Sequence, residues 1–465
     1  MKYILRSAQL CYCVAVGFLL IGQPQVLNAA HLSDQQTKIL SLTQAIQLAH
    51  KHDPWIKANQ HSQNAMESLS VSSGALPDPK VSMGIANIAF DSFDFSQETM
   101  TQFKVGVSQL LPRGDSLKIK QQQLNQLAKQ YPYMRDDRRA KVSVDVAKFW
   151  LDAFKAQESI ELIESDRALF EQLADVAEAN YSSAVGKTRQ QDIVRAQLEL
   201  TRLDDRLTML KQQLAVSRGK LSEYLMVSDN NYNNDRSGLT NFFTFNTYIF
   251  SRKMPENKLI KSDLILADKP MNSQILFEYF SSHPRVKAFD QKIKASEIAV
   301  KLTKQQYKPQ WDLSASYGYR DSSPLGIERS DLFSIGVTFD VPLFTENKQD
   351  KNVQSAIFKS SANKTEKWLL LRKMMASFES NKVRLKSLIK RRKLYKKRLL
   401  PQMHDQAEAS LTAYTNDDGD FSEVVRSRIA ELNASIDFLN IKVEIQKSIF
   451  QSNYFFIQYL NEGEI

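Results

Sequence analysis

Few residues in this 465-residue chain have the types and the spacing that catalysis or ligand binding would need. Gly186-Lys187-Thr188 is similar to the end of a phosphate-binding loop, but that loop needs a glycine at position 181, which is Tyr181. The six histidines show no spacing typical of a metal site, since even His50 and His52 point to different sides of a helix. No nucleophile–base constellation or dinucleotide motif is present. We therefore expect a protein that is not an enzyme and uses no cofactor and no resident metal.

Charged residues occur in two other notable settings, at expected helix starts and in a basic run. Asp192 and Glu423 each open a helix after a turn that contains a glycine, Gly186 or Gly419, and the helix dipole favours an acid there. Glycine itself suits the left-handed end of the preceding helix. Between Lys382 and Arg398, ten of seventeen residues are Lys or Arg, interleaved with leucines at helical spacing. A solvated helix face fits this run better than a nucleic-acid site, and contact with a partner protein or cell-wall polymer is an open alternative.

The N-terminal residues have the order of a secretory signal peptide. Lys2 and Arg6 precede an apolar run from Cys11 to Ile21, which is too short to cross a bilayer as a helix, and small residues follow at 28–30. Removal of residues 1–29 would take both cysteines and lower the net charge of +10 by two, to +8. The exported chain would then have no disulfide, and no later stretch approaches ~20 consecutive apolar residues. Any entry into a membrane must use strands.

The pattern of the chain occurs twice, at a constant offset of 230 positions. The matching residues are Pro54 and Pro284, Pro79 and Pro309, Phe103 and Phe333, Gly106 and Gly336, Val107 and Val337, and Pro112 and Pro342. A repeat this long indicates two copies of one folding unit, each read as helix, two strands, long helix, turn and helix. We expect residues 30–226 and 273–465 to form these units, joined by a linker or equatorial segment over residues 227–272.

Two segments in each copy alternate apolar and polar residues, which predicts strands with one apolar face. In the second copy that face comprises Trp311, Leu313, Ala315, Tyr317 and Tyr319, then Phe333, Ile335, Val337, Phe339 and Val341. The first copy repeats it more loosely, with Val81, Met83 and Ile85, then Phe103, Val105 and Val107. Segments of about ten residues are long enough to cross a bilayer as tilted strands, so we expect these side chains to face lipid.

A soluble hairpin packed on a helix is the alternative, which the export signal disfavours. Because lipid tolerates no open sheet edge and the smallest barrels have about eight strands, several chains must share one barrel.

The remaining segments carry apolar residues at alternating steps of three and four, the signature of a coiled coil. Four such seams run through residues 146–177, 193–221, 368–389 and 425–443, with Arg167 and Lys382 as charged positions within them. Each copy therefore carries an antiparallel helical hairpin. The first descending helix is expected from about Ser116 to Ala184, bent at Pro132, with a length of about 100 Å.

Strand pair, long helix, glycine-containing turn and returning helix, duplicated behind a signal peptide, resemble the TolC family of outer-membrane efflux proteins, the outer membrane factors. The local marks of this resemblance are Gly74–Pro79, Gln97–Gln102, Gly106–Pro112, Val185-Gly186 with Asp192, and Gly419–Val424. Several of them are most similar to the branch that serves heavy-metal efflux pumps. The resemblance covers nearly the whole exported chain.

The resemblance implies a mixed α and β membrane protein. Three chains with four strands each would form one twelve-stranded transmembrane β-barrel that continues into a long α-helical coiled-coil barrel. The homotrimer would sit in the outer membrane of a Gram-negative bacterium, extend into the periplasm, and work with a periplasmic adaptor (membrane fusion) protein and an inner-membrane pump of the RND type. No nucleic acid is implied.

The resemblance also assigns residues near the closed end of the channel. Asp192 and Glu423 map to the pore constriction, whereas Arg426 stands where some relatives carry a second acid. The adaptor contacts map to the hairpin tips, at Val185, Gly186, Lys187 and Gly419.

The function expected is a passive exit duct of a tripartite efflux system, with heavy-metal cations among its candidate cargoes. The exit duct of a type I protein-secretion system shares the fold, and neighbouring genes would separate the two. A periplasmic coiled-coil scaffold without a pore would instead be soluble and would tolerate charges beside Trp311 and Tyr317.

Overall fold

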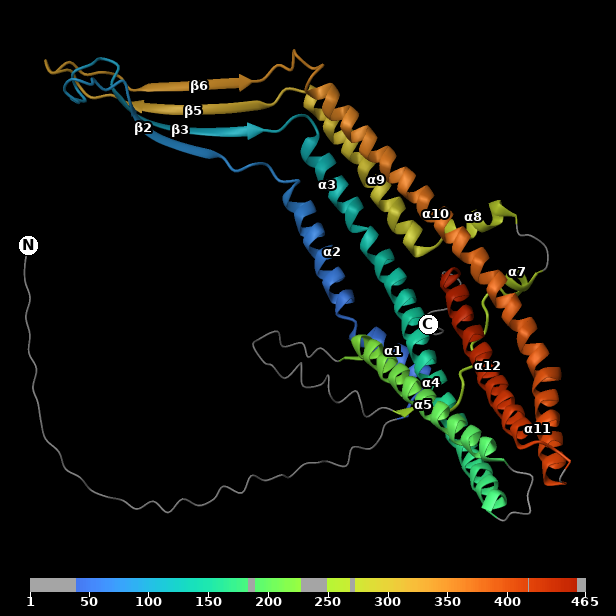
Figure 1. Cartoon of the computed structure of the whole chain (residues 1–465). Helices are drawn as coiled ribbons and strands as arrows, with labels where there is room; N and C mark the ends of the chain where they lie inside the picture. The colour runs from blue at the N-terminus through green and yellow to red at the C-terminus, as the bar shows by residue number, and fades with distance from the viewer. Residues whose placement is uncertain (1–38, 183–188, 227–248, 268–271, 417, 458–465) are drawn as a thin grey trace, which may run out of the picture.

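The computed structural model describes residues 39–182, 189–226, 249–267, 272–416 and 418–457. The molecule is elongated, with a four-stranded sheet at one end and long helices that run away from it (Figure 1). The expected signal peptide, residues 1–29, lies outside the described residues.

Within the described residues, the strands form two sheets. The larger is antiparallel throughout and has the order β2 (Lys80–Ala86), β3 (Gln102–Leu111), β5 (Trp311–Tyr319) and β6 (Leu332–Phe339). In the smaller sheet, β1 (Ile39–Leu40) pairs in parallel with β4 (Ile249–Phe250). The larger sheet joins strands from both halves of the sequence, because its central pair is β3 with β5.

The helices of the first half are α1 (Leu42–His52), α2 (Pro54–Ser72), α3 (Ser116–Ala128), α4 (Gln130–Ser182) and α5 (Gln190–Leu225). Those of the second half are α7 (Ser262–Leu266), α8 (Ser273–Ser281), α9 (Pro284–Lys304), α10 (Gln349–Leu394), α11 (Leu400–Thr415) and α12 (Phe421–Tyr454), with short η2 (Gln305–Tyr307) and η3 (Tyr395–Leu399). Helices α2 and α9 begin alike. Each has proline at its first position, and the preceding side chain, Asp53 or His283, accepts a backbone N–H two residues on.

The first descending helix is broken between α3 and α4, close to the bend expected at Pro132. Lys129 lies between the two helices, and Pro132 occupies the first turn of α4. Proline has no N–H to donate, and its ring clashes with the carbonyl of the residue four positions earlier, here Ala128. The break is therefore a direct result of the proline, displaced by three residues toward the N-terminus.

The second descending helix contains a feature that the sequence did not lead us to expect. Between α10 and α11, η3 is a five-residue π-helix. Pro401 lies in the first turn of α11 and cannot donate to the carbonyl of Lys397, which favours a wider turn at this place. The basic run of Lys382–Arg398 thus ends within a π-bulge.

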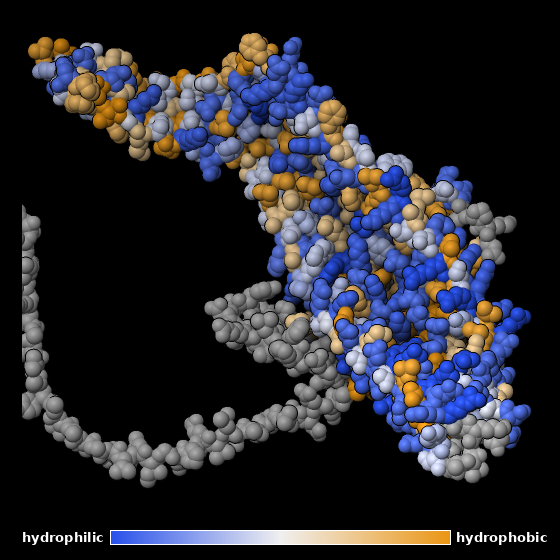
Figure 2. Space-filling model, viewed as in Figure 1, coloured by the Kyte–Doolittle hydropathy of each residue, from blue (hydrophilic) through white to orange (hydrophobic). Residues whose placement is uncertain are grey.

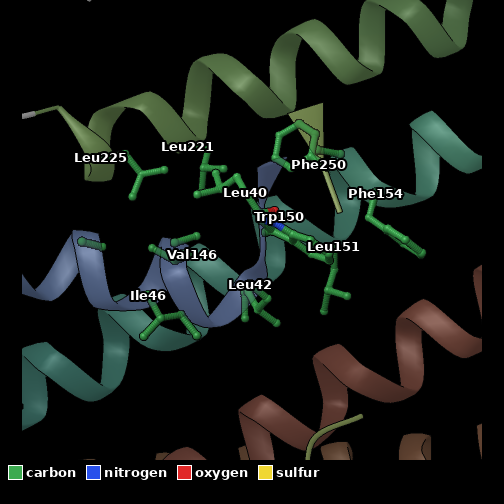
Figure 3. Packing of buried hydrophobic residues seen from close by; sticks show 14 of the residues in the cluster. Leu40, Leu42, Ile46, Val146, Trp150, Leu151, Phe154, Leu221, Leu225 and Phe250 are labelled. Carbon is green, nitrogen blue, oxygen red and sulfur yellow. Dashed lines mark hydrogen bonds between the residues drawn. The ribbon is translucent and has the colours of Figure 1, made fainter. Parts of the chain in front are cut away.

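Three buried clusters hold the helices together. In the first, Trp150 of α4 stacks on Phe154 at 5.5 Å between ring centroids and donates its indole N–H to Leu40 O at 3.0 Å (Figure 3). Phe250 of β4 meets the same indole edge-on at 6.0 Å, so the small sheet is anchored on α4. The second cluster surrounds Phe280, Phe378 and Phe456, and the third includes Ile163, Phe170, Leu203, Leu207 and Leu432.

Most seam residues lie in these clusters, but Trp368 does not follow the expected pattern. Trp368 is 62% exposed and stacks on Phe277 of α8 at 5.5 Å instead of packing between the coiled helices. Lys382 is only 6% exposed, with its ammonium 4.0 Å from Glu379. Its aliphatic stem takes the apolar place that the heptad pattern gives it.

The described part of the linker, residues 249–267, crosses three helices. Gln157 of α4 donates to Phe250 O at 3.2 Å, and Ile260 N donates to Asn453 of α12 at 2.9 Å. Ile265 of α7 is fully buried in the cluster that contains α10 residues. This segment therefore ties α4, α12 and α10 together.

Candidate functional site: the strand hairpins and the helical tip

The register of the larger sheet brings the expected apolar residues of its four strands to one face, whereas Val341 lies beyond the end of β6. Residues directly opposite each other on antiparallel strands share a face. Val81 lies opposite Val107, Val105 opposite Tyr317, and Leu313 opposite Val337. The alternation in four separate sequence segments therefore produces a single apolar surface that runs across all four strands.

This apolar face is uncovered in the single chain. Met83, Phe333 and Ile335 are 72%, 69% and 75% exposed, respectively. In the view of Figure 2, hydrophobic residues are interspersed with hydrophilic ones along the strand end of the molecule. An exposed apolar surface that spans a whole sheet marks a contact with lipid or protein. The other expected lipid-facing residues are also partly or largely exposed: Trp311, Leu313, Tyr317, Val337 and Phe339.

The opposite face carries mainly small and polar residues, with Leu110 and Leu332 as exceptions. Gly106 lies opposite both Ser82 and Ser316, and a Cβ at Gly106 would lie 2.9 Å from the Ser82 hydroxyl. Ser314 donates to Gly336 O at 3.3 Å. This face can contact water at little cost in free energy. The sheet is therefore apolar on one side and hydrophilic on the other.

The loops at the far end of the two hairpins are fastened to each other. Arg329, in the loop between β5 and β6, donates to the carbonyls of Ser96 and Glu98 at 3.2 and 2.9 Å. Thr101 closes the first loop by donating to Asn87 O at 2.8 Å. The Arg329 contacts therefore join the loop between β5 and β6 to the loop between β2 and β3.

At the other end of the molecule, Asp192 forms part of a helix start. Its carboxylate accepts the backbone N–H of Arg189 at 2.9 Å, and the residue is only 5% exposed. The side chain thus satisfies a backbone donor at the beginning of α5. In the single chain, the described geometry supports a capping role for Asp192.

Glu423 occupies a different environment at the beginning of α12. Asp420 caps this helix by accepting Ser422 N at 3.0 Å, which leaves the Glu423 side chain 43% exposed. The Glu423 carboxylate pairs with Arg426 at 2.8 Å. The two acids that the sequence treats as equivalent are therefore a buried cap and an exposed ion pair.

The turn before α12 requires glycine because of close packing. A Cβ on Gly419 would lie 2.6 Å from the backbone nitrogen of Tyr414 and 2.8 Å from Ala413 C. The only glycines with positive φ among the described residues are Gly114 and Gly326, so the left-handed conformation expected at Gly419 is wrong. The other predicted adaptor contacts, at Val185, Gly186 and Lys187, lie outside the described residues.

Sequence reasoning missed a charged cluster above this turn. Arg428 of α12 bridges Glu408 of α11 at 2.6 Å and Glu431 at 2.9 Å, and His404 also contacts Glu431 at 2.7 Å. The Glu431 carboxylate raises the pKa of His404. Burial, reinforced by Glu431, raises the pKa of Asp166 on α4. No local sequence motif predicts this cluster, because its residues come into contact only when α4, α11 and α12 pack together.

None of the described helices is both long and apolar enough to cross a bilayer. Within the described ranges, no group of three or more His, Cys, Asp or Glu side chains has the geometry to hold a metal ion.

No protein-family model matches the chain, and no curated protein matches it. Solved structures do match. The outer membrane channel CmeC of Campylobacter jejuni has a TM-score of 0.69 at 16% identity, covering 89% of this chain and 85% of its own. The outer membrane protein VceC of Vibrio cholerae has a TM-score of 0.68 at 11% identity, covering 90% and 95%. CusC, solved in a study of folding and transmembrane channel formation, has a TM-score of 0.67 at 11% identity, covering 89% and 91%. This chain therefore has the fold of outer-membrane channel proteins.

Proposed function

We propose that this chain is an outer-membrane exit duct of a tripartite efflux system, which conducts substrates passively from a pump and its adaptor to the outside. The observation that carries the proposal is the continuous exposed apolar face of the β2-β3-β5-β6 sheet, joined directly to long helical hairpins. The fold shared with CmeC, VceC and CusC supports it.

The sheet requires further copies of the chain. β2 and β6 are edge strands, and each presents unpaired N–H and C=O groups along one side. In lipid every such group must be paired, and four strands are too few to close a barrel. A homotrimer that contributes four strands per chain gives a closed barrel of twelve.

The helices provide the rest of the duct. Helix α4 has 53 residues, and at 1.5 Å per residue it is about 80 Å long. Such a helix reaches well beyond a bilayer of ~30 Å core thickness into the periplasm. The polar face of the sheet, with Ser314 and Gly336, would line the barrel, and the turn near Gly419 would meet the adaptor of an RND-type pump.

The first test is the native mass of the protein extracted in mild detergent from separated outer membranes. We expect a discrete three-chain species in that fraction. A soluble periplasmic monomer would overturn the duct, because four strands cannot close alone, and would leave the coiled-coil scaffold as the better interpretation.

For the cargo, we propose heavy-metal cations, on the likeness of Gly419–Val424 and the other local motifs to the heavy-metal branch. A deletion strain complemented with this chain should regain tolerance to a panel of metal salts. Restored tolerance to organic drugs alone, or restored export of one large protein alone, would assign a different cargo to the same duct.

A further inference from the structure

The end of α10 and the η3 turn that follows it carry a dense run of basic residues. Seven of the nine residues from Lys390 to Arg398 are Lys or Arg, and no acidic residue occurs between Glu379 and Asp405. All seven basic residues are exposed. Acids three or four positions away can offset such charge on a helix, and here the sequence supplies none.

These cations also have no acidic partner on neighbouring helices. Nearer the start of α10, Lys364 and Lys367 pair with Glu297 and Asp290 of α9. By contrast, no ion pair with a described residue is formed by any of the seven, namely Lys390, Arg391, Arg392, Lys393, Lys396, Lys397 and Arg398. Their charge is therefore uncompensated within the described part of the chain, and repulsion at helical spacing destabilises the helix.

The fold itself does not require this charge. Helix α4 is the counterpart of α10 in the first copy, and the matching turn residues Gly186 and Gly419 are offset by 233 positions rather than 230. The counterpart of Lys386–Arg398 therefore lies within residues 153–168, which contain four acidic and two basic residues. Lys386–Arg398 contains eight basic residues and no acid. Since a long helix of the same kind forms with the opposite charge, the basic run serves something other than folding.

Four lysines of this region lie in one row along the helix. Lys386, Lys390, Lys393 and Lys397 follow each other in steps of four, three and four residues, so they share a face. At 1.5 Å per residue, this lysine ridge is about 17 Å long. Its first member, Lys386, donates to Ala267 O at the end of α7. The ridge therefore lies on the side of α10 that carries the linker, and it continues along the helix beyond the linker.

The linker side is the outside of the proposed duct, because a conduit needs its interior free. Helix α7 lies beside the middle of α10 (Figure 1). Next to the ridge, a groove of about 460 Å³ between α10, α12 and the linker is lined by Leu385, Arg392 and Lys442 among others. The ridge thus borders a hollowed surface with further cations, on which a chain-like partner can lie.

The position of the ridge along the molecule argues against lipid and against the adaptor as its partner. From Gln349, where α10 begins after the strands, to Lys390 the helix is about 60 Å long, which places the ridge beyond the reach of lipid headgroups. From Lys397 to Thr415, where α11 ends, the distance along the helix is about 27 Å. The ridge therefore lies between the membrane and the tip at which the adaptor is expected.

The residue type favours a polymer over a folded protein. Lysine is depleted in protein–protein interfaces, whose centres are rich in aromatic residues and Arg. The ridge consists of lysines alone, and each is a hydrated point charge on a flexible stem. Such a row can follow a flexible chain of repeated negative charges without imposing one fixed geometry on it.

We infer that the lysine ridge binds a carboxylate-bearing polymer of the cell wall, which passes the duct on its outer side beside the linker. This inference goes beyond the proposed function and rests on it for the compartment. The carboxylates of the polymer supply the negative charge that the chain itself does not place near the ridge. Because the contact is electrostatic and releases counterions, its affinity falls as the salt concentration rises.

Co-sedimentation with purified cell-wall sacculi tests this contact, because sacculi pellet at speeds at which the protein in non-ionic detergent stays in solution. We expect the unmodified protein to pellet with the sacculi at low salt. The bound fraction should fall at least about fivefold between ~50 and ~200 mM salt. Sacculi whose carboxyl groups have been converted to amides should bind at least about fivefold less protein, because they no longer carry the negative charge.

The combined substitutions Lys390→Gln, Lys393→Gln and Lys397→Gln remove three charges of the ridge and leave the Lys386 contact with the linker in place. We expect them to lower the bound fraction at least about tenfold. Arg at the same three positions keeps the charge and should keep the binding. Because the ridge lysines repel one another, the Gln variant should melt at the same temperature as the unmodified protein or higher.

A matched control changes the net charge by the same amount elsewhere. Lys301, Lys351 and Lys359 are exposed and form no ion pair with a described residue. Their combined replacement by Gln should leave the bound fraction within about twofold of that of the unmodified protein, because only net charge changes and not the ridge.

The possible results separate this inference from the duct itself. Equal binding by the ridge and control variants, or undiminished binding to amidated sacculi, overturns the inference. A smaller three-chain fraction in the ridge variant alone would assign the ridge to a contact between copies and overturn it as well. Unchanged binding to sacculi with loss of a co-purified adaptor would assign the ridge to an acidic protein surface instead. A three-chain species that does not bind sacculi overturns the inference and leaves the duct intact, whereas a soluble monomer overturns the duct.

Discussion

Val105 of β3 lies directly opposite Tyr317 of β5 in the antiparallel sheet. The two residues belong to hairpins from different halves of the chain, and their pairing merges two apolar faces into one. A slip of one residue between β3 and β5 would turn one hairpin's apolar side chains toward the polar face of the other. This pairing therefore makes the sheet a single surface suited to lipid.

The first prediction concerns that surface. Val337→Arg places a charge on the apolar face of β6, and we expect it to cost up to ~2–4 kcal/mol per chain near the bilayer midplane. Thr338→Arg, one residue along on the polar face, is the matched control. Gel separation of unheated outer-membrane extracts measures the assembled fraction. Normal assembly of the Val337→Arg variant would argue that this face does not meet lipid.

The apolar face could be predicted from the sequence because a strand has a period of two and each face has its own chemistry. Val81, Met83 and Ile85 were placed on it by alternation alone, and the pairing with Val107, Val105 and Phe103 agrees. The break near Pro132 was also predictable, since the effect of proline on a helix is local. The partner of each strand was not, because alternation says nothing about strand order.

The environments of Asp192 and Glu423 at the helical tip were harder to predict, because they depend on which segments pack together. The sequence gives Asp192 and Glu423 the same position after a turn, yet one is a buried cap and the other an exposed ion pair. The difference depends on Arg426 and on how neighbouring helices pack, which a repeat in the sequence does not contain. The π-helix at Tyr395–Leu399 has a local cause, Pro401, but the apolar periodicity of the helix is continuous there, so the sequence did not lead us to expect it.

The second prediction separates the roles of the two acids. Glu423→Gln keeps the size of the side chain and removes its charge, so it should weaken cation block or raise leak conductance in planar bilayers if Glu423 lines the constriction. Helix stability should change little, because Asp420 supplies the cap of α12. Conductance and selectivity equal to those of the unmodified protein would mean that Glu423 does not line a constriction.

For Asp192 we expect substitution to change helix stability, in contrast to Glu423. Asp192→Ala removes the acceptor of the Arg189 N–H and should destabilise the start of α5 by about 1 kcal/mol. Asp192→Asn retains an acceptor and should recover most of that loss. Thermal unfolding of the detergent-solubilised protein measures both, and equal melting temperatures for the two variants would contradict the capping role.

The third prediction concerns the turn before α12. Gly419→Ala forces a Cβ against the Tyr414 backbone, at 2.6 Å from its nitrogen, so the turn must open. We expect a loss of about 1–3 kcal/mol, similar to other overpacked sites, and increased proteolysis at the tip. Gly219→Ala is the control, because nothing lies within 4 Å of its Cβ and alanine favours the interior of α5. It should leave stability unchanged or raise it by up to about 1 kcal/mol. A tip equally protease-resistant in both variants would count against the close-packing argument.

The last prediction concerns pH. His283 is fully buried between the two halves of the molecule, where its Nε2 donates to Tyr454 O at 3.0 Å and its Nδ1 accepts Arg285 N–H at 3.2 Å. Burial lowers the pKa of this imidazole from 6.5 to about 4. Nearby Asp137 opposes the shift, and Lys141 and Arg285 reinforce it. The folded state therefore holds His283 neutral, in the tautomer that carries its proton on Nε2.

The sign of the effect follows from comparing the two states. Above pH 6.5 the imidazole is neutral whether the chain is folded or not, so its full contribution to stability is present. As the pH falls from 6.5 toward 4, only the unfolded chain takes up the proton, and stability decreases by about 1.4 kcal/mol per pH unit, up to about 3 kcal/mol per chain. Below pH 4 both states are protonated and this loss is complete.

His283→Asn keeps a capping side chain for α9 but cannot titrate. The melting temperature of this variant should therefore fall less steeply between pH 6.5 and 4 than that of the unmodified protein. Parallel curves over this range would mean that the buried imidazole is not responsible for the acid sensitivity, because every other titrating group, Asp137 included, is the same in both proteins.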